Sequence, residues 1–221
     1  MIKIILTIVL TITSIFAQAQ LQGSGKITTT TYDYKNFDKV YLEDLDGKIE
    51  IEIGKPWSIS VTIDDNLKHL LVFSENTSEY ELKIQFKGNK NNKKYIEKTN
   101  TKIKITMPEA SVIKNEGNSD LDVKNVFGRY FRLENTGNGD SRILGTIDAL
   151  DINKTGNGDV NAENLTAKKA TLHSTGNGNL TVNVSETLSA KVSGNGDIIN
   201  KGKAKFDANS KKSGNGKLIT N

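Results

Sequence analysis

A Gly-Asn-Gly tripeptide recurs at a nearly constant spacing through the second half of this 221-residue chain, and it constrains the fold more than any other feature. If an incomplete first copy at Gly117 is included, the leading glycines are 20, 19, 20, 18 and 20 residues apart. A period near 20 residues indicates a solenoid, in which each repeat forms one coil that packs on the next. The complete copies consist of Gly137, Asn138, Gly139, Gly156, Asn157, Gly158, Gly176, Asn177, Gly178, Gly194, Asn195, Gly196, Gly214, Asn215 and Gly216.

Apolar and polar residues alternate before each copy. The residues six and four before the leading glycine are mostly apolar and the residue between them is polar, as in Phe131, Arg132 and Leu133. This period of two predicts half-buried strands, and equivalent strands of successive repeats should pair in parallel. We therefore predict an all-β fold whose C-terminal half is a right-handed parallel β-helix with coils of about 18–20 residues. The alternative is a hairpin meander, because Asn-Gly is a strong hairpin signal, but a meander needs a comparable turn in every half-period.

The repeated tripeptide has two interpretations. In the structural one, Asn and Gly provide positive φ at a tight corner, as at Gly158 and Gly178, while Asp and Thr bond to free backbone groups there. In the other, Asp140, Asp159 and Asp197, each three residues after a leading glycine, form a row of oxygen ligands that suits Ca²⁺. The structural interpretation is favoured, and no cofactor is expected.

The first half of the chain has a different pattern. Five longer alternating runs predict strands, and the segment 64–73 predicts one helical turn or a short helix capped by Asp64 or Asp65. We expect this region to pack on the solenoid or to continue it. The predicted organisation is a signal peptide (1–19), a linker (20–36), an N-terminal β-rich region (37–110) and a β-solenoid (111–221). The five runs are 40–42, 48–53, 58–63, 80–86 and 101–107.

The N-terminus has the pattern of an export signal. A short basic start, Met1-Ile2-Lys3, precedes a largely apolar run over 4–16, and Ala17-Gln18-Ala19 is a small-x-small cleavage site. That run of 13 residues is shorter than the roughly 20 that a spanning helix needs. We therefore expect an exported protein without a transmembrane segment in the mature chain, located in the periplasm, on the outer-membrane surface or outside the cell.

Composition limits the chemistry that the chain can perform. The absence of cysteine excludes disulfides, thiolate metal sites and a cysteine nucleophile. Only two histidines occur, His69 and His173, so a histidine-based triad cannot be assembled from the sequence. Thirty basic and 26 acidic side chains are interspersed, which does not indicate nucleic-acid binding, and the basic stretch 87–94 is interpreted as a solvated hairpin tip. No catalytic residues are predicted.

Four features of the sequence match a known family. They are the opening Phe37-Asp38-Lys39-Val40, the strand 47–51, the strand 103–108 that leads to Ile113, and the repeated Thr-Gly-Asn-Gly-Asp. From Phe37 to the C-terminus the chain resembles the putative auto-transporter adhesin, head GIN-domain family of exported Gram-negative bacterial proteins. The resemblance implies a β-helix-like all-β structure, and it transfers no catalytic residues.

Together these observations predict a non-enzymatic β-solenoid that serves as a structural or adhesin-like binding module at the cell envelope. Its partner would be a glycan or an envelope protein. The alternative is a polysaccharide-active enzyme on a β-helix scaffold, which would need two carboxylates and a basic residue converging in a groove. Because six lysines in the last 21 residues protect the exposed final coil, we expect a monomer or a weak dimer.

Overall fold

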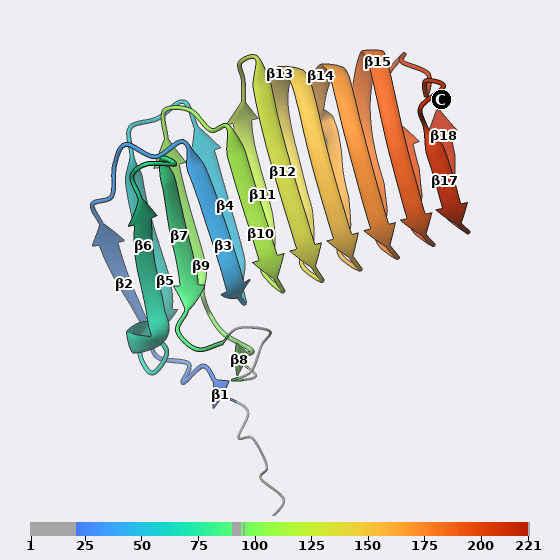
Figure 1. The fold of residues 1–221 in the computed structure, drawn as a ribbon. Coiled ribbons are helices and arrows are strands. Elements are labelled where there is room, and N and C mark those ends of the chain that lie inside the picture. Colours follow the sequence, from blue (N-terminus) through green and yellow to red (C-terminus); the bar gives the residue numbers. More distant parts are fainter. Residues whose placement is uncertain (1–20, 90–93, 95, 221) are drawn as a thin grey trace, which may run out of the picture.

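Strands make up most of the computed structural model, which describes residues 21–89, 94 and 96–220. They form a curled sheet that runs the length of the molecule (Figure 1), so the predicted all-β class is confirmed. Within these described residues no helix is long and apolar enough to cross a membrane. The predicted signal peptide (1–19) and part of the basic stretch 87–94 lie outside the described residues.

The curled sheet consists of two halves, here called the entry face and the exit face, which meet at the Gly-Asn-Gly turns and enclose the core. We call strands that run toward these turns entry strands and strands that leave them exit strands. The entry strands are β3 (Lys39–Leu45), β10 (Val112–Gly117), β12 (Tyr130–Gly137), the second halves of β13 (Ser141–Gly156), β14 (Val160–Gly176) and β15 (Leu180–Gly194), and β17 (Lys211–Gly214). The exit strands are β4 (Lys48–Ile53), β11 (Asp120–Val126), the first halves of β13, β14 and β15, β16 (Ile198–Asn200) and β18 (Leu218–Thr220).

Equivalent residues of successive repeats are direct partners in the sheet. Leu133 pairs with Ile152, Ile152 with Leu172, and Leu172 with Ala190, always in parallel. The same register extends toward the N-terminus, because β10 pairs in parallel with β3 and β11 pairs in parallel with β4. Since the side-chain period of a strand is two, this register keeps every apolar row on the inside of the curl.

A continuous apolar core lies between the two faces. Phe131 and Leu133 from the entry strands, and Leu121 and Val160 from the exit strands, are all at most 2% exposed. The stacked rows change from leucine and isoleucine to smaller residues such as Ala190 near the C-terminus. Because each strand presents alternate residues inward, the remaining residues form the outer surface of the sheet.

Antiparallel strands complete the N-terminal end. β9 (Lys102–Met107) pairs in parallel with β4, then β5 (Ser58–Asp64) and β2 (Ile27–Tyr32) continue the exit face in antiparallel order. On the other face β7 (Glu81–Phe86) pairs in parallel with β3, and β6 (Leu71–Asn76) is its antiparallel edge. A short separate pair consists of β1 (Leu21–Gln22) and β8 (Ile96–Glu97).

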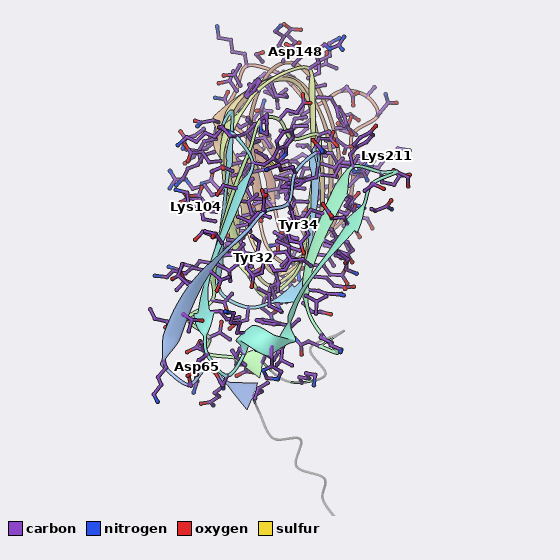
Figure 2. All side chains as sticks on the ribbon, turned by 90° about the vertical axis from the view of Figure 1, so that its left-hand side faces the viewer. Tyr32, Tyr34, Asp65, Lys104, Asp148 and Lys211 are labelled. Atoms are coloured by element: carbon purple, nitrogen blue, oxygen red, sulfur yellow. The ribbon has the colours of Figure 1, made fainter. Side chains whose placement is uncertain are left out.

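Aromatic rings bring the two edges of the curled sheet together at this end. The ring of Phe73, in β6, lies 4.3 Å from that of Tyr32 and 5.3 Å from that of Tyr34, measured between centroids. Figure 2 shows both tyrosines at the end of the curl that faces the viewer. The contact joins edge strand β2 to edge strand β6 without backbone pairing, and all three rings pack against the core.

The segment 64–73 contains a 3₁₀ helix, Lys68–Leu70, which has no side-chain cap. The expectation of a helical turn is therefore confirmed, but the expected capping by Asp64 or Asp65 is wrong. Asp64 is fully buried, and its carboxylate accepts hydrogen bonds from the backbone N–H groups of Gly25, at 2.8 Å, and Asn100, at 2.7 Å. Burial alone would raise the pKa of Asp64, but these hydrogen bonds outweigh it and lower the pKa.

The carboxylate of Asp64 should make stability depend on pH in the acid range. Its folded-state pKa is lowered, so its contribution is complete above about pH 4 and is lost as the pH falls through the folded-state value. We expect Asp64→Asn to lower the free energy of unfolding by about 1–3 kcal/mol at pH 7, and by less at pH 3. Urea denaturation at both pH values measures this difference. The exposed neighbour provides the control: Asp65→Asn should change stability by less than about 0.5 kcal/mol, and equal effects of the two variants would contradict the assignment.

Candidate functional site

The leading glycine of each turn has a backbone that other residues avoid. Its φ is +119° at Gly156 and +111° at Gly176, in the left-handed half of conformational space. A Cβ atom at Gly156 would also collide with the carbonyl oxygen of Gly137, in the preceding repeat. The successive backbones therefore approach so closely at this point that a side chain has no room.

The second glycine is required for a different reason. Gly158 and Gly178 have no positive φ, and neither does Asn157, so the expectation of positive φ at these positions is wrong. A Cβ atom at Gly158 would instead collide with the carbonyl oxygen of Gly139. The close approach between neighbouring turns, and not a left-handed backbone, is what excludes larger residues here.

The asparagines of the turns form a hydrogen-bonded ladder along the ridge. The side-chain amide of Asn157 donates to the amide oxygen of Asn138 at 2.9 Å, and that of Asn177 donates to Asn157 at 2.7 Å. Equivalent bonds join Asn118 to Asn138 and Asn177 to Asn195, and the ladder continues to the last turn. These exposed amides therefore link each turn to the next one along the ridge.

A second ladder runs through the acidic residues of the turns. A carboxylate oxygen of Asp140 accepts the backbone N–H of Asp159 at 2.8 Å, and Asp159 in turn accepts that of Asn179 at 2.7 Å. Asp197 accepts the backbone N–H of Lys217 at 2.8 Å. Across the part of the chain that the structure describes, no three His, Asp or Glu side chains are grouped so that they could hold a metal ion.

A buried row of polar side chains supports the turns from inside. Asn135 donates to the carbonyl oxygen of Gly139 at 3.2 Å, and the ammonium of Lys154 donates to that of Gly156 at 3.1 Å. Lys154 is 1% exposed, and burial lowers its pKa. This row was not predicted from the sequence, although the period of two places it inside, two residues before each leading glycine.

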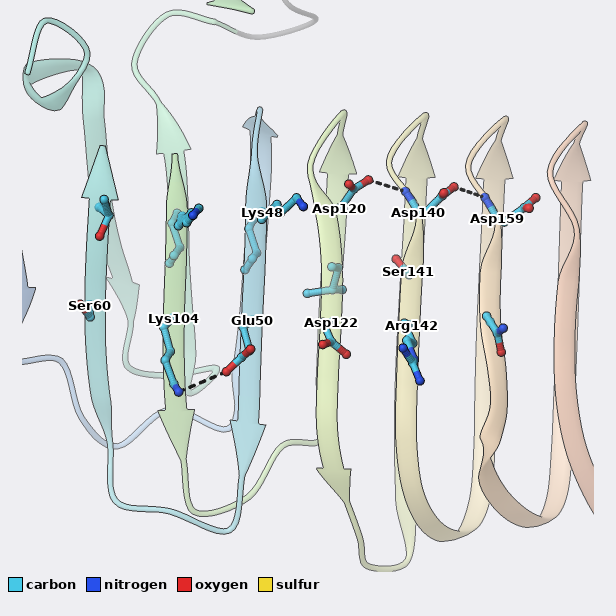
Figure 3. A pocket seen from close by; sticks show the side chains of 16 residues that line it. Lys48, Glu50, Ser60, Lys104, Asp120, Asp122, Asp140, Ser141, Arg142 and Asp159 are labelled. Atoms are coloured by element: carbon cyan, nitrogen blue, oxygen red, sulfur yellow. Dashed lines mark hydrogen bonds and ion pairs between the residues drawn. The ribbon is translucent and has the colours of Figure 1, made fainter. Parts of the chain in front are cut away.

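A broad groove of about 920 Å³ lies on the outer side of the exit strands. Its floor crosses β5, β9, β4 and β11 and the beginnings of β13 and β14 (Figure 3). Because neighbouring strands are in register, its central polar residues form one row. From β5 to β14 this row consists of Ser60, Lys104, Glu50, Asp122, Arg142 and Asn161. We call this feature the charged groove.

Ion pairs hold the centre of the charged groove. Glu50 accepts from the ammonium of Lys124 at 2.7 Å and lies 3.2 Å from that of Lys104. The hydrogen bond from Lys124, followed by that from Lys104, lowers the pKa of Glu50, so this carboxylate stays ionised at neutral pH. It therefore does not have the raised pKa that a general acid needs.

The edge of the charged groove beside the turns carries both charges in one row. Lys102 pairs with Lys48 in the register and Lys48 pairs with Asp120, and Asp140 and Asp159 continue the row (Figure 3). Among the described residues, the side-chain ammonium groups of Lys48 and Lys102 have no hydrogen-bond or ion-pair partner. The groove thus offers free cations next to carboxylates, each of which has one oxygen that accepts no hydrogen bond from the described residues.

Arg142, beside the carboxylate row, adds a third free cation. Of the predicted row, Asp140 and Asp159 line the charged groove, while Asp197 lies farther along the ridge and does not. Lys48, Glu50 and Lys104 were not predicted as site residues from the sequence. Charged residues alternating with isoleucine in 48–53 and 102–107 are the signal that such an outer surface exists.

In-register strands and stacked turns define this chain as an all-β repeat protein with a charged outer groove. The family model described as "Putative auto-transporter adhesin, head GIN domain" matches residues 36–204, so the chain belongs to this family and the resemblance is confirmed. No curated protein matches the chain.

Solved structures share the fold. A putative adhesin from Bacteroides fragilis is 24% identical, with a TM-score of 0.67 over 90% of this chain and 99% of its own. A putative lipid binding protein from Parabacteroides distasonis is 22% identical, with a TM-score of 0.50 over 91% and 98%. At these identities the likeness establishes the fold alone.

The close approach at the turns predicts a specific sensitivity to substitution. Gly158→Ala places a Cβ against the backbone of the preceding turn, and we expect it to lower the free energy of unfolding by about 2–3 kcal/mol. Gly128→Ala is the control, because Gly128 has φ +115° but open space around it, so only backbone strain of about 1 kcal/mol applies. Urea denaturation measures both; a smaller loss for Gly158→Ala than for Gly128→Ala would contradict the close-approach argument.

The two interpretations of the aspartate row predict different responses to calcium. If the carboxylates serve as hydrogen-bond acceptors for the next turn, Asp159→Asn keeps an acceptor and costs less than about 1 kcal/mol, whereas Asp159→Ala removes it and costs more. Added Ca²⁺ should then leave the melting temperature unchanged. A rise of several degrees with Ca²⁺, abolished in Asp159→Asn, would favour a metal site instead.

Proposed function

We propose that the protein is an exported, non-enzymatic, adhesin-like binding module at the cell envelope, and that the charged groove holds its ligand. The observation that carries the proposal is the pairing of free cations, Lys48, Lys102 and Arg142, with carboxylates on one open face. The family to which the chain belongs is named for adhesins, which supports a binding role at a surface. The predicted signal peptide supports export.

The free cations of the charged groove suit an acidic glycan as the ligand. Carboxylates of such a polymer would pair with Lys48 and Lys102, and its hydroxyl groups would donate to the free oxygens of Asp120 and Asp140. The groove is open and spans several strands, which suits a polymer more than a small molecule. An envelope protein with a mixed-charge surface is the other partner that this face could bind.

The fold supports the same proposal. We infer that the curled sheet is a right-handed parallel β-helix over 111–221, which residues 37–110 continue. The parallel pairing of equivalent residues in successive repeats and the handedness rule for parallel connections support this inference. Such a scaffold presents long, rigid outer faces and needs no moving parts to bind an extended ligand.

Binding through the charged groove should depend on its free cations. Isothermal titration calorimetry with polygalacturonate should give saturable binding that weakens with salt, and dextran, a neutral polymer, should bind more weakly. The triple variant Lys48→Gln, Lys102→Gln, Arg142→Gln should lose at least tenfold in affinity.

A control of equal charge comes from exposed lysines outside the groove. The triple variant Lys169→Gln, Lys191→Gln, Lys203→Gln removes the same net charge from exposed sites. It should bind polygalacturonate within about twofold of the unmodified protein. Equal losses in both triple variants would show that only net charge matters, and the proposed site would be wrong.

A polysaccharide-active enzyme is the second candidate. The charged groove does bring carboxylates and basic residues together, which is the arrangement such an enzyme would need. The ion-paired, lowered pKa of Glu50 argues against an acid there. Prolonged incubation with polygalacturonate should therefore release no new reducing ends or unsaturated products, and release that depends on Glu50 would favour the enzyme.

We further propose that the protein is a monomer or a weak dimer. The last strands, β17 and β18, each pair with a neighbour on one side only, and Lys211, Lys212 and Lys217 are exposed there. Light scattering at moderate salt should find mainly monomer, and neutralising these three lysines with glutamine should promote association. A stable, salt-independent oligomer of the unmodified protein would contradict this proposal.

A further inference from the structure

A second hollow, of about 350 Å³, lies at the rim opposite the Gly-Asn-Gly turns. It is formed by residues that precede β3, β5 and β7 and by the connection from β9 to β10. Figure 1 shows the beginnings of β3 and β7 side by side at this rim, far from the ridge of turns. We call this feature the aromatic pocket; its lining is Asn36, Phe37, Asp38, Trp57, Tyr80 and Glu109.

Trp57 provides a fixed aromatic surface in the aromatic pocket. Its indole N–H donates to the carbonyl oxygen of Phe37 at 3.0 Å, and its ring is half-buried against the core. Because its single donor is already bonded, the indole can offer a ligand only the apolar surface of its ring. The hydrogen bond also sets the orientation of the ring before any ligand arrives.

Tyr80 lines the aromatic pocket with an unusual backbone conformation. Its φ is +54°, which is rare for a bulky residue, and the residue is 60% exposed. Its carbonyl oxygen accepts hydrogen bonds from the backbone N–H groups of Asp38, at 3.0 Å, and Lys39, at 3.1 Å. Strained backbone that the surroundings enforce is frequent at binding sites, and here Tyr80 ends the turn 77–80 and lines the same solvent-facing hollow as Trp57.

Three polar side chains of the aromatic pocket are free to bind. Among the described residues, those of Asn36, Asp38 and Glu109 make no hydrogen bond or ion pair. The two carboxylates accept hydrogen bonds, and the amide both donates and accepts. The pocket therefore combines aromatic surface with acceptors for hydroxyl groups.

We propose that the aromatic pocket binds one pyranose ring of a glycan. A pyranose has a face of C–H groups that packs on aromatic rings, and its hydroxyl groups can donate to Asp38 and Glu109. The volume is near the lower end of the range for ligand pockets, which fits a single ring. This site is separate from the charged groove and does not depend on the function proposed for it.

The single tryptophan of the chain makes the proposal directly measurable. Because Trp57 lines the pocket, its fluorescence should report occupancy without any label. Titration with methyl β-glucopyranoside, methyl β-galactopyranoside and methyl N-acetyl-β-glucosaminide should give a saturable change with at least one of them. Choline chloride is the comparison probe, because aromatic rings beside carboxylates also attract organic cations.

Two variants of Tyr80 distinguish the loss of the aromatic ring from a loss of folding. Tyr80→Gly removes the aromatic ring, and glycine accepts the positive φ without strain, so the protein should stay folded and lose at least tenfold in affinity. Tyr80→Phe keeps the ring and should bind within about threefold of the unmodified protein. Tyr130→Ala removes another exposed tyrosine, outside the pocket, and should leave binding unchanged.

Several outcomes would overturn the proposal. They are no saturable response to any of the three glycosides, a response to choline alone, or unchanged glycoside binding in Tyr80→Gly. The triple variant of the charged groove should still bind the glycosides normally. If the unmodified protein bound polygalacturonate but none of the three glycosides, this inference would be wrong and the proposed function would still stand.

Discussion

The close approach of backbones between successive Gly-Asn-Gly turns is the constraint on which the rest of the structure depends. At Gly156 and Gly158 alike, a single added carbon would collide with the backbone of the preceding turn. This approach lets the asparagine ladder form, and it aligns the strands on both sides of each turn. Once the turns are in register, each apolar row falls inside the curl and each polar row falls outside.

Register also explains how a surface suited to binding arises from a repetitive scaffold. Parallel stacking places Lys104, Glu50, Asp122 and Arg142 in one row, although they come from four strands that are far apart in the sequence. The ion pairs around Glu50 keep the carboxylate in the middle of this row ionised. Antiparallel strand β5 then extends the sheet beside the row, so that the charged groove forms at the junction of the two architectures.

The repeat period and the alternation around Leu133 and Ile152 were sufficient to predict the all-β class and the parallel pairing of the repeats. They could not predict the groove, because its floor depends on β5 and β9, whose order in the sheet differs from their order in the chain. The reason for glycine at Gly158 was also beyond the sequence, since a contact between turns leaves no local signal. Tyr80 belongs to no sequence motif, and only its positive φ distinguishes it from other exposed tyrosines.

Amide hydrogen exchange at the turns tests the central claim most directly. The backbone N–H of Asn157 donates to the carbonyl oxygen of Gly137 at 3.0 Å, and that of Asn177 donates to Gly156 at 3.1 Å, although both side chains are exposed. We expect slow exchange of these amides, comparable to that of strand amides in the core, because opening one turn breaks its contacts with the next. Fast exchange, as in an ordinary exposed loop, would contradict the claim that the stacked turns set the register of the fold.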